Sequence, residues 1–268
     1  MAHRRTGPRP LLGVVHLQAC PSASRHRGMA ALLDAALADA EAWAQGGVDG
    51  LVLENFGDAP FHKGTATDPV PPDVVATLAV AADRLRAATG LPLAINCLRN
   101  DGRAALGVAA VVGARWVRVN VLAGAYATDQ GVIEGEAAAL FAYRRQLHSE
   151  VAVLADFLVK HASPLAPVDV AAGARDLAER SGAAGLVLSG ARTGVPVDVA
   201  LLDTVRAAVG EFPLWLGSGL SVANAAVLWP RCDGAIVGTA CKRDGRVEAP
   251  VDAARVRELR LQCPPDPR

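Results

Sequence analysis

Lysine is scarce in this chain of 268 residues, because only three of its 27 basic side chains are lysine and the rest are arginine. The three are Lys63, Lys160 and Lys242. A bias toward arginine codons explains the shortage, but it does not explain why each remaining lysine follows a predicted strand. We therefore treat all three lysines as candidate functional groups.

The chain also lacks an excess of charge of either sign, with 27 basic against 27 acidic residues and an isoelectric point near 7. Such a chain has no field that attracts a polyanion, which argues against nucleic acid or an anionic membrane surface as the main partner. Its 51% hydrophobic content excludes a disordered chain and allows one or two domains with a sizeable core. Small neutral or locally anionic molecules remain as candidate ligands.

Cysteine pairs and long apolar runs are missing too. The five cysteines form no Cys-x-x-Cys pair, and their odd number argues against a disulfide framework. The apolar run at 11–15 is too short for a signal peptide, and polar residues interrupt the stretch 106–126, which excludes a membrane span there. The sequence therefore predicts a cytoplasmic protein without membrane insertion.

Short β-branched runs alternate with longer alanine-rich stretches along the whole chain. Eight runs predict strands, at 11–16, 50–54, 91–97, 116–120, 151–156, 185–189, 213–217 and 234–238. Eight stretches predict helices, at 29–45, 72–88, 101–112, 134–148, 168–180, 197–209, 222–228 and 251–262.

Eight such units in about 250 residues predict a (β/α)8 TIM barrel. No Gly-x-Gly-x-x-Gly follows the first strand, which argues against a doubly wound sheet. We expect one barrel domain over residues 11–263, between a basic leader at 1–10 and a proline-rich tail at 264–268, both frayed.

Polar side chains stand at or near the carboxyl ends of six predicted strands, where the active sites of such barrels are built. These candidates are His16, Glu54, Asn55, Asn96, Asn120, Asp156 and Ser189.

The last two strands end instead in small residues, Gly217-Ser218-Gly219 and Gly238-Thr239. Glycines let backbone N–H groups approach an anion, and a following helix start adds its positive end, so these loops predict a phosphate cradle. The loop after the sixth strand, with Gly190, offers Arg192 as a clamp, although a solvated loop arginine is an equal alternative.

Asp156 precedes Lys160 and His161 by a few positions, so one strand and its loop bring a base, a cation and an imidazole together. Proton abstraction next to a carbonyl requires such a base and a cation that holds the oxyanion, here Lys160 or Lys63. A lysine Schiff base is less supported, because Lys160 lies in a loop and not on an inward-facing strand position.

A divalent metal is an alternative ligand of the same strand ends. His16, Glu54, Asp156 and His161 have the ligand types for it, but a lone histidine in apolar surroundings is more often a structural group. Apart from this alternative metal, the sequence predicts no cofactor. Asp129 belongs to a polar loop after the fourth strand that we expect to cover a substrate.

Several strings resemble the BtpA/SgcQ family over residues 11 to about 260. They are Gly-Val-Val-His at 13–16, Glu-Asn-Phe-Gly-Asp-Ala-Pro at 54–60, Asn-Cys-Leu-Arg-Asn-Asp at 96–101, Val-Lys-His-Ala at 159–162 and Val-Gly-Thr-Ala-Cys-Lys at 237–242. The resemblance implies a barrel of the ribulose-phosphate-binding type. By position it implies functional roles for Glu54, Asn55, Asp58, Asn96, Asn120, Asp129, Asp156, Lys160, His161, Ser218, Thr239 and Lys242.

The resemblance leaves the activity open, since one branch of the family is named for photosystem I biogenesis and another is associated with sugar-phosphate metabolism. We expect an enzyme of the isomerase, epimerase or lyase type acting on a phosphorylated metabolite. The alternatives are a non-catalytic biogenesis factor for a membrane complex such as photosystem I and a metal-dependent phosphate-ester hydrolase. Apolar helix faces make a homo-oligomer plausible.

Overall fold

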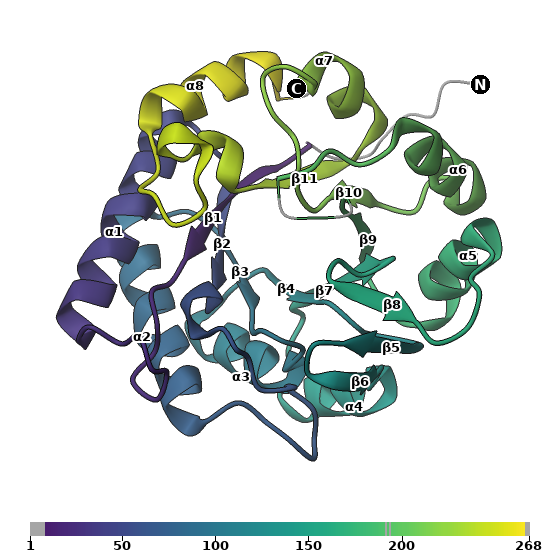
Figure 1. The fold of residues 1–268 in the computed structure, drawn as a ribbon, viewed down its shortest axis with the longest axis horizontal. Helices are drawn as coiled ribbons and strands as arrows, with labels where there is room; N and C mark the ends of the chain where they lie inside the picture. The colour runs from purple at the N-terminus through teal and green to yellow at the C-terminus, as the bar shows by residue number, and fades with distance from the viewer. Residues whose placement is uncertain (1–8, 191, 193, 266–268) are drawn as a thin grey trace.

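The computed structural model describes residues 9–190, 192 and 194–265, and within them eight parallel strands close into a barrel. Figure 1 looks along this barrel, with the strands in a ring and the helices around it. The predicted (β/α)8 architecture and all eight predicted strands are confirmed. The strands are β1 (Leu11–His16), β2 (Gly50–Glu54), β3 (Leu93–Asn96), β4 (Trp116–Val119), β7 (Ala152–Phe157), β9 (Gly185–Leu188), β10 (Leu214–Leu216) and β11 (Gly234–Val237).

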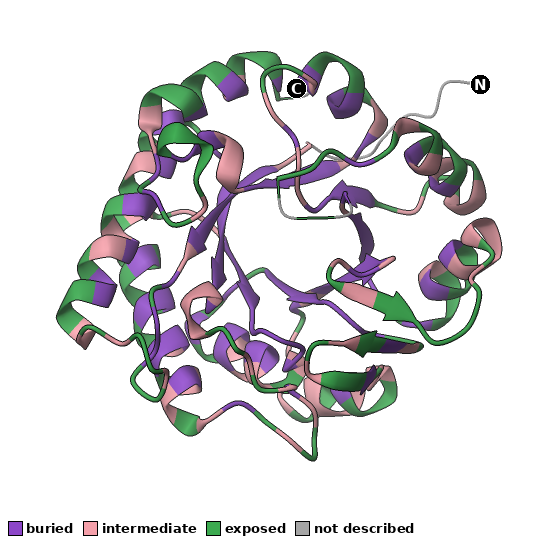
Figure 2. Cartoon of the chain, in the orientation of Figure 1, coloured by how far each residue is buried: buried purple, intermediate pink, exposed green. Residues whose placement is uncertain are grey.

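The helices occupy the predicted intervals and cover the outside of the barrel, as Figure 2 shows by their buried inner and exposed outer faces. They are α1 (Met29–Gly46), α2 (Pro72–Thr89), α3 (Gly102–Val112), α4 (Ala137–Gln146), α5 (Val170–Arg180), α6 (Val199–Val209), α7 (Ala225–Leu228) and α8 (Ala253–Gln262). Two helices are shorter than predicted, since α4 covers 137–146 instead of 134–148 and α7 covers 225–228 instead of 222–228. Of the predicted frayed ends at 1–10 and 264–268, residues 1–8 and 266–268 lie outside the described residues.

Strand pairing closes the ring because β1 pairs in parallel with both β2 and β11. One face of each strand packs on the helices. Gly13 illustrates how closely, since a Cβ there would lie 2.2 Å from the ring of Trp43 on α1, whose indole nitrogen donates to Val14 O. The other face points into the barrel, where Trp116 and Trp215 meet edge to face at 6.1 Å.

A small antiparallel sheet was not predicted. Its strands β5 (Ala125–Thr128), β6 (Gly131–Glu134) and β8 (Ala162–Pro164) lie beside the mouth of the barrel. Tyr126 and Ile133 pack there on Val121 and Val159, a separate apolar cluster that stabilises the sheet. Residue 134 therefore belongs to β6, and α4 begins at 137 instead of the predicted 134.

Of the described helices, none combines the length and the hydropathy that a bilayer crossing requires.

Candidate active site

The interior of the barrel has an apolar lower layer and a polar upper layer. Inward positions alternate along each strand, so a residue two positions after a buried apolar one faces the same side, as Val52 and Glu54 do on β2. The upper layer takes one residue from each barrel strand or from the position just after it: His16, Glu54, Asn96, Arg118, Asp156, Ser189, Gly217 and Gly238.

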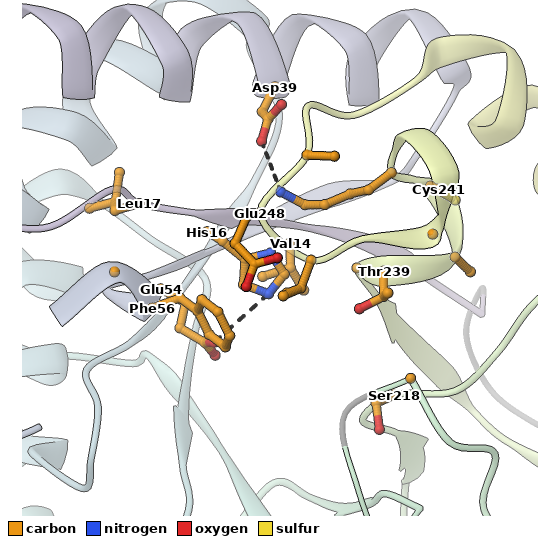
Figure 3. A pocket seen from close by; sticks show the side chains of 18 of the residues that line it. Val14, His16, Leu17, Asp39, Glu54, Phe56, Ser218, Thr239, Cys241 and Glu248 are labelled. Atoms are coloured by element: carbon orange, nitrogen blue, oxygen red, sulfur yellow. Dashed lines mark hydrogen bonds and ion pairs between the residues drawn. The ribbon is translucent and has the colours of Figure 1, made fainter. Parts of the chain in front are cut away.

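A cavity of about 1350 Å³ opens above this layer, at the carboxyl ends of the strands. Figure 3 shows His16, Glu54 and Phe56 grouped on one side of it, and Ser218 and Thr239 on another. Twelve of the predicted site residues line the cavity, namely His16, Glu54, Asn120, Asp129, Lys160, His161, Gly217, Ser218, Gly219, Gly238, Thr239 and Lys242.

An ion pair that the sequence did not predict forms the floor. Arg118 donates through Nε to Asp156 Oδ1 at 2.8 Å and through a terminal nitrogen to Oδ2 at 2.9 Å. Asn120 donates to the same Oδ2 at 2.8 Å. Both oxygens of the buried Asp156 are therefore engaged in charge-assisted bonds, while Arg118 itself lines the cavity. The signal for Arg118 was its position, two residues after the inward-facing Trp116 and two before Asn120.

His16 and Glu54 meet on neighbouring strands, with His16 Nε2 at 4.0 Å from Glu54 Oε1. Burial, together with the positive charges of Lys242, Lys160 and Arg118, lowers the pKa of His16 to about 3. Burial also raises the pKa of Glu54, against the opposing effect of Arg118 and Lys160. The site thus holds a neutral imidazole next to a carboxyl group whose pKa is raised by burial.

Lys160 and His161 lie in the short loop between β7 and β8. Burial first, and then the charge of Arg118, lowers the pKa of Lys160 to about 8. Burial and the nearby Lys160 also lower the pKa of His161. Arg99, which sequence reasoning missed, is buried and donates to the carbonyl oxygen of Lys160 at 2.6 Å.

The two glycine-containing loops face the cavity as predicted. A Cβ on Gly219, which has a φ of +78°, would lie 2.2 Å from Val195 O, and a Cβ on Gly238 would lie 2.9 Å from the His16 ring. Only glycine fits both places. The hydroxyl of Ser218 is buried and has no hydrogen-bond partner within the described part of the chain. An unpaired buried hydroxyl is costly, so it is available to a ligand.

The predicted contribution of helix starts to this cradle is not supported. The first element after Gly219 is the four-residue α7, and Gly238 is followed by a single 3₁₀ turn at Thr239–Cys241. Backbone N–H groups and side-chain hydroxyls are therefore the donors that these loops offer.

Several other candidates are bonded to neighbouring parts of the chain. Lys242 lines the cavity, but its ammonium bonds to Asp39 on α1 at 3.3 Å (Figure 3), and its predicted contact with a phosphate stays a prediction. Asn55 binds both the N–H and the carbonyl of Leu98, and Asn96 donates to Arg118 O. The predicted residues that do not line the cavity are Asn55, Lys63, Asn96, Asp156, Ser189 and Gly190. In the loop after β9, residues 191 and 193 lie outside the described residues.

The predicted metal set is not assembled. Throughout the described ranges, no three His, Cys, Asp or Glu side chains come together as a metal site would require. The physical reason is that Arg118 occupies both oxygens of Asp156 and Lys160 adds a second cation to the mouth. Of the predicted metal ligands, all of them within the described residues, His16 and Glu54 lie next to each other without a third.

Solved structures share the fold. Over 95% of this chain and 92% of the other, the TM-score is 0.61 with Mycobacterium tuberculosis tryptophan synthase, at 16% identity. It is 0.56 with N-(5'-phosphoribosyl)anthranilate isomerase from Pyrococcus furiosus, at 12% identity and over 95% and 98% of the chains. At these identities the likeness shows the barrel alone.

Sequence relatives are much closer. The photosystem I biogenesis protein BtpA of Synechocystis is 44% identical over 92% of this chain and 85% of its own length. An uncharacterized protein of Thermococcus kodakarensis is also 44% identical, over 94% of both chains. The family model described as BtpA family matches residues 8–262. The chain therefore belongs to the BtpA family.

Proposed function

We propose that this protein is an enzyme that acts on a small phosphorylated metabolite, a sugar phosphate in the first place, by isomerisation, epimerisation or bond cleavage next to a carbonyl group. One observation carries the proposal: a single cavity is lined by ionisable side chains on one side and by a glycine-rich hydroxyl-bearing surface on the other. Placing Glu54, Arg118 and Lys160 inside a barrel costs stability, and a catalytic role would explain why the chain keeps them there.

The phosphate would lie against Gly217–Gly219 and Gly238–Thr239. The unpaired hydroxyl of Ser218 supports this placement, as does the absence of a Cβ at both glycine loops. The His16 ring lies against Gly238 and also contacts Phe56 at a ring-centroid distance of 4.8 Å, so the wall next to the phosphate is formed by flat rings.

Proton transfer falls to Glu54 and Lys160 in this proposal. A carboxyl group with a raised pKa and an amine with a pKa near 8 form an acid and base pair matched to neutral pH. The base role predicted for Asp156 stays a prediction, but its two engaged oxygens favour another task. Asp156 would hold Arg118 and Asn120 in position, and His161 and Asp129 would close over the substrate.

A second candidate function is support of a membrane complex, which the name of the Synechocystis relative suggests. A factor of that kind acts through its surface and has no use for the buried groups of the mouth. Double replacement of Glu54 by Gln and Lys160 by Met decides between the two. Loss of the phenotype that the intact gene supports favours the enzyme, and an unchanged phenotype favours the factor.

Thermal-shift measurements with inorganic phosphate, ribose 5-phosphate and ribose test the anion site. A ligand at 100 times its dissociation constant adds about 2.7 kcal/mol to the free energy of unfolding. We expect stabilisation by both phosphates, loss of it in Ser218→Asp, and no loss in the control Ser163→Asp on the exposed β8. Equal shifts with ribose and ribose 5-phosphate, or none at all, would refute the phosphate cradle.

A further inference from the structure

Lys160 lines the central cavity and, unlike Lys242, has no ion-pair partner among the described residues. Within the described residues its Nζ makes neither a hydrogen bond nor an ion pair, although the side chain lines the central cavity. Lys242, in contrast, is bonded to Asp39, and Lys63 lies outside the cavity. A partly buried ammonium without a direct ion-pair partner is unfavourable, so burial shifts the protonation equilibrium of Lys160 toward the neutral amine.

The two acidic side chains whose charges act on Lys160, Asp156 and Glu54, do not serve as its direct counter-ion. Both oxygens of Asp156 are held by Arg118 and Asn120. The pKa of Glu54 is raised by burial, which disfavours its charged form. Arg118 and Arg99 meanwhile add positive charge near the amine, and with burial they bring the pKa of Lys160 down to about 8. At neutral pH about a tenth of such an amine is unprotonated, far more than of an ordinary lysine.

The backbone around Lys160 is built to hold the amine in place. Leu158 and His161, on either side, both take left-handed conformations with φ of 55° and 54°. Side chains with a Cβ rarely adopt these angles, and each costs of order 1 kcal/mol. The carbonyl of Lys160 accepts from Arg99 at 2.6 Å, and the chain then enters β8, where Ala162 pairs with Thr128. A loop fixed at both ends thus presents Lys160 to the mouth. The sequence predicted this place for Lys160 but not the fixed conformation of its loop.

We propose that Lys160 is a nucleophile that forms an imine with the carbonyl carbon of a phosphorylated aldehyde or ketone. The inference rests on the proposed function and names the covalent step of that same site. The neutral amine attacks the carbonyl carbon, and the C–N bond forms while the C=O π electrons move to oxygen. That oxygen takes a proton from Glu54 and becomes a hydroxyl, and the nitrogen then loses one proton to the Glu54 carboxylate. Glu54 passes this second proton to the hydroxyl, which leaves as water while the nitrogen lone pair forms the C=N bond of the protonated imine. The protonated imine then draws electrons from a neighbouring C–H or C–C bond.

Borohydride trapping tests this proposal. The intact protein is incubated separately with dihydroxyacetone phosphate, glyceraldehyde 3-phosphate and ribose 5-phosphate, then reduced with sodium borohydride and mapped by peptide mass spectrometry. Because the chain has only three lysines, each adduct is assigned without ambiguity, and Lys63 and Lys242 are internal controls. We expect at least ten times more reduced adduct on Lys160 than on Lys63 with at least one of the three. The yield should rise between pH 7 and 9 with a midpoint near 8.

Matched controls keep the outcome decisive. Lys160→Arg retains the positive charge without a nucleophilic amine, so it should keep the thermal shift with inorganic phosphate and lose the labelling. Unphosphorylated dihydroxyacetone should label Lys160 at least tenfold less than its phosphate.

Each remaining result has one meaning. A phosphate shift without an adduct, or equal labelling of Lys63 and Lys160 in every case, overturns the imine and leaves the anion site standing. Selective labelling of Lys160 without any phosphate shift supports the imine and refutes the anion site.

Discussion

His16 is a residue whose titration is strongly changed by its environment. It ends β1, contacts Glu54 on the next strand and the ring of Phe56, and its Nδ1 has no partner in the part of the chain that the structure describes. Its motif position predicted a functional histidine, but nothing in the sequence indicated that four barrel strands would surround it. The charges of Arg118, Lys160 and Lys242 reach it from elements far apart in the chain.

The low pKa of His16 predicts a specific pH dependence of stability. Its native pKa is about 3 and its unfolded value 6.5, so the unfolded chain binds the extra proton between these two values. This contribution is complete above pH 6.5 and is lost as the pH falls toward 3, by up to about 1.4 kcal/mol per pH unit. In urea titrations between pH 7 and 5, His16→Gln should show a flatter decline than the wild type. The exposed control His148→Gln should follow the wild type, and equal slopes in all three would contradict the assignment.

We expect removal of the Lys160 amine to raise the free energy of unfolding. The buried cation has no counter-ion among the described residues, so Lys160→Met should raise the free energy of unfolding at pH 7 by about 1 kcal/mol. Lys63→Met, a lysine outside the cavity, should change it by less than about 0.5 kcal/mol. Chemical denaturation of both variants measures the difference, and a loss of stability in Lys160→Met would show that the amine has a structural role.

At the scale of elements, the succession of short β-branched runs and alanine-rich stretches, with polar or small residues at the ends of the runs, carried most of the sequence prediction. It placed His16, Glu54, Asn120 and the two glycine loops at one end of a barrel, and the structure brings them to one cavity. The sequence prediction failed where the pairing of distant segments determines the structure. The strand β5 pairs antiparallel with β8 across more than thirty residues of chain, and no local pattern marks that pairing, whereas β5 and β6 form a short hairpin around residues 129 and 130.

The partner of Lys242 was also not predicted from the sequence, and it explains how the segment after β11 is held. Asp39 on α1 binds Lys242 Nζ through one oxygen and Val251 N through the other, so one carboxylate fixes both ends of the segment 242–251. Glu248 of this segment is among the side chains that line the cavity in Figure 3. The pairing joins residues more than two hundred positions apart, which no spacing in the sequence indicates.

Truncation of the Asp39 side chain should therefore lower the free energy of unfolding by a large amount for a single substitution. Asp39→Ala leaves Lys242 buried without its partner, and breaking such a pair costs about 3 kcal/mol or more. Asp34→Ala, at an exposed position of the same helix, is the control and should cost less than about 0.5 kcal/mol. Hydrogen exchange should show faster exchange of the Val251 amide in Asp39→Ala. Equal stability of the two variants would contradict the anchoring role.

At the scale of the whole molecule, the closed sheet separates two tasks. The apolar lower layer with Trp116 and Trp215 stabilises the barrel, while the upper layer holds Glu54, Arg118 and Asp156 at positions that only closure brings together. The sequence alone predicted the barrel and its phosphate loops. It left the partner of each charged group open, because these partners come from strands that are neighbours only in the folded ring.

Deuterium exchange tests the central claim that this mouth moves a proton next to a carbonyl group in a phosphorylated substrate. The protein is incubated in D₂O with dihydroxyacetone phosphate, glyceraldehyde 3-phosphate or ribose 5-phosphate, and proton NMR follows the C–H signal next to the carbonyl. We predict loss of that signal with the wild type for at least one of them, slowed at least 100-fold in Glu54→Gln and in Lys160→Met. Binding of the phosphates without any exchange above the protein-free rate would contradict the account.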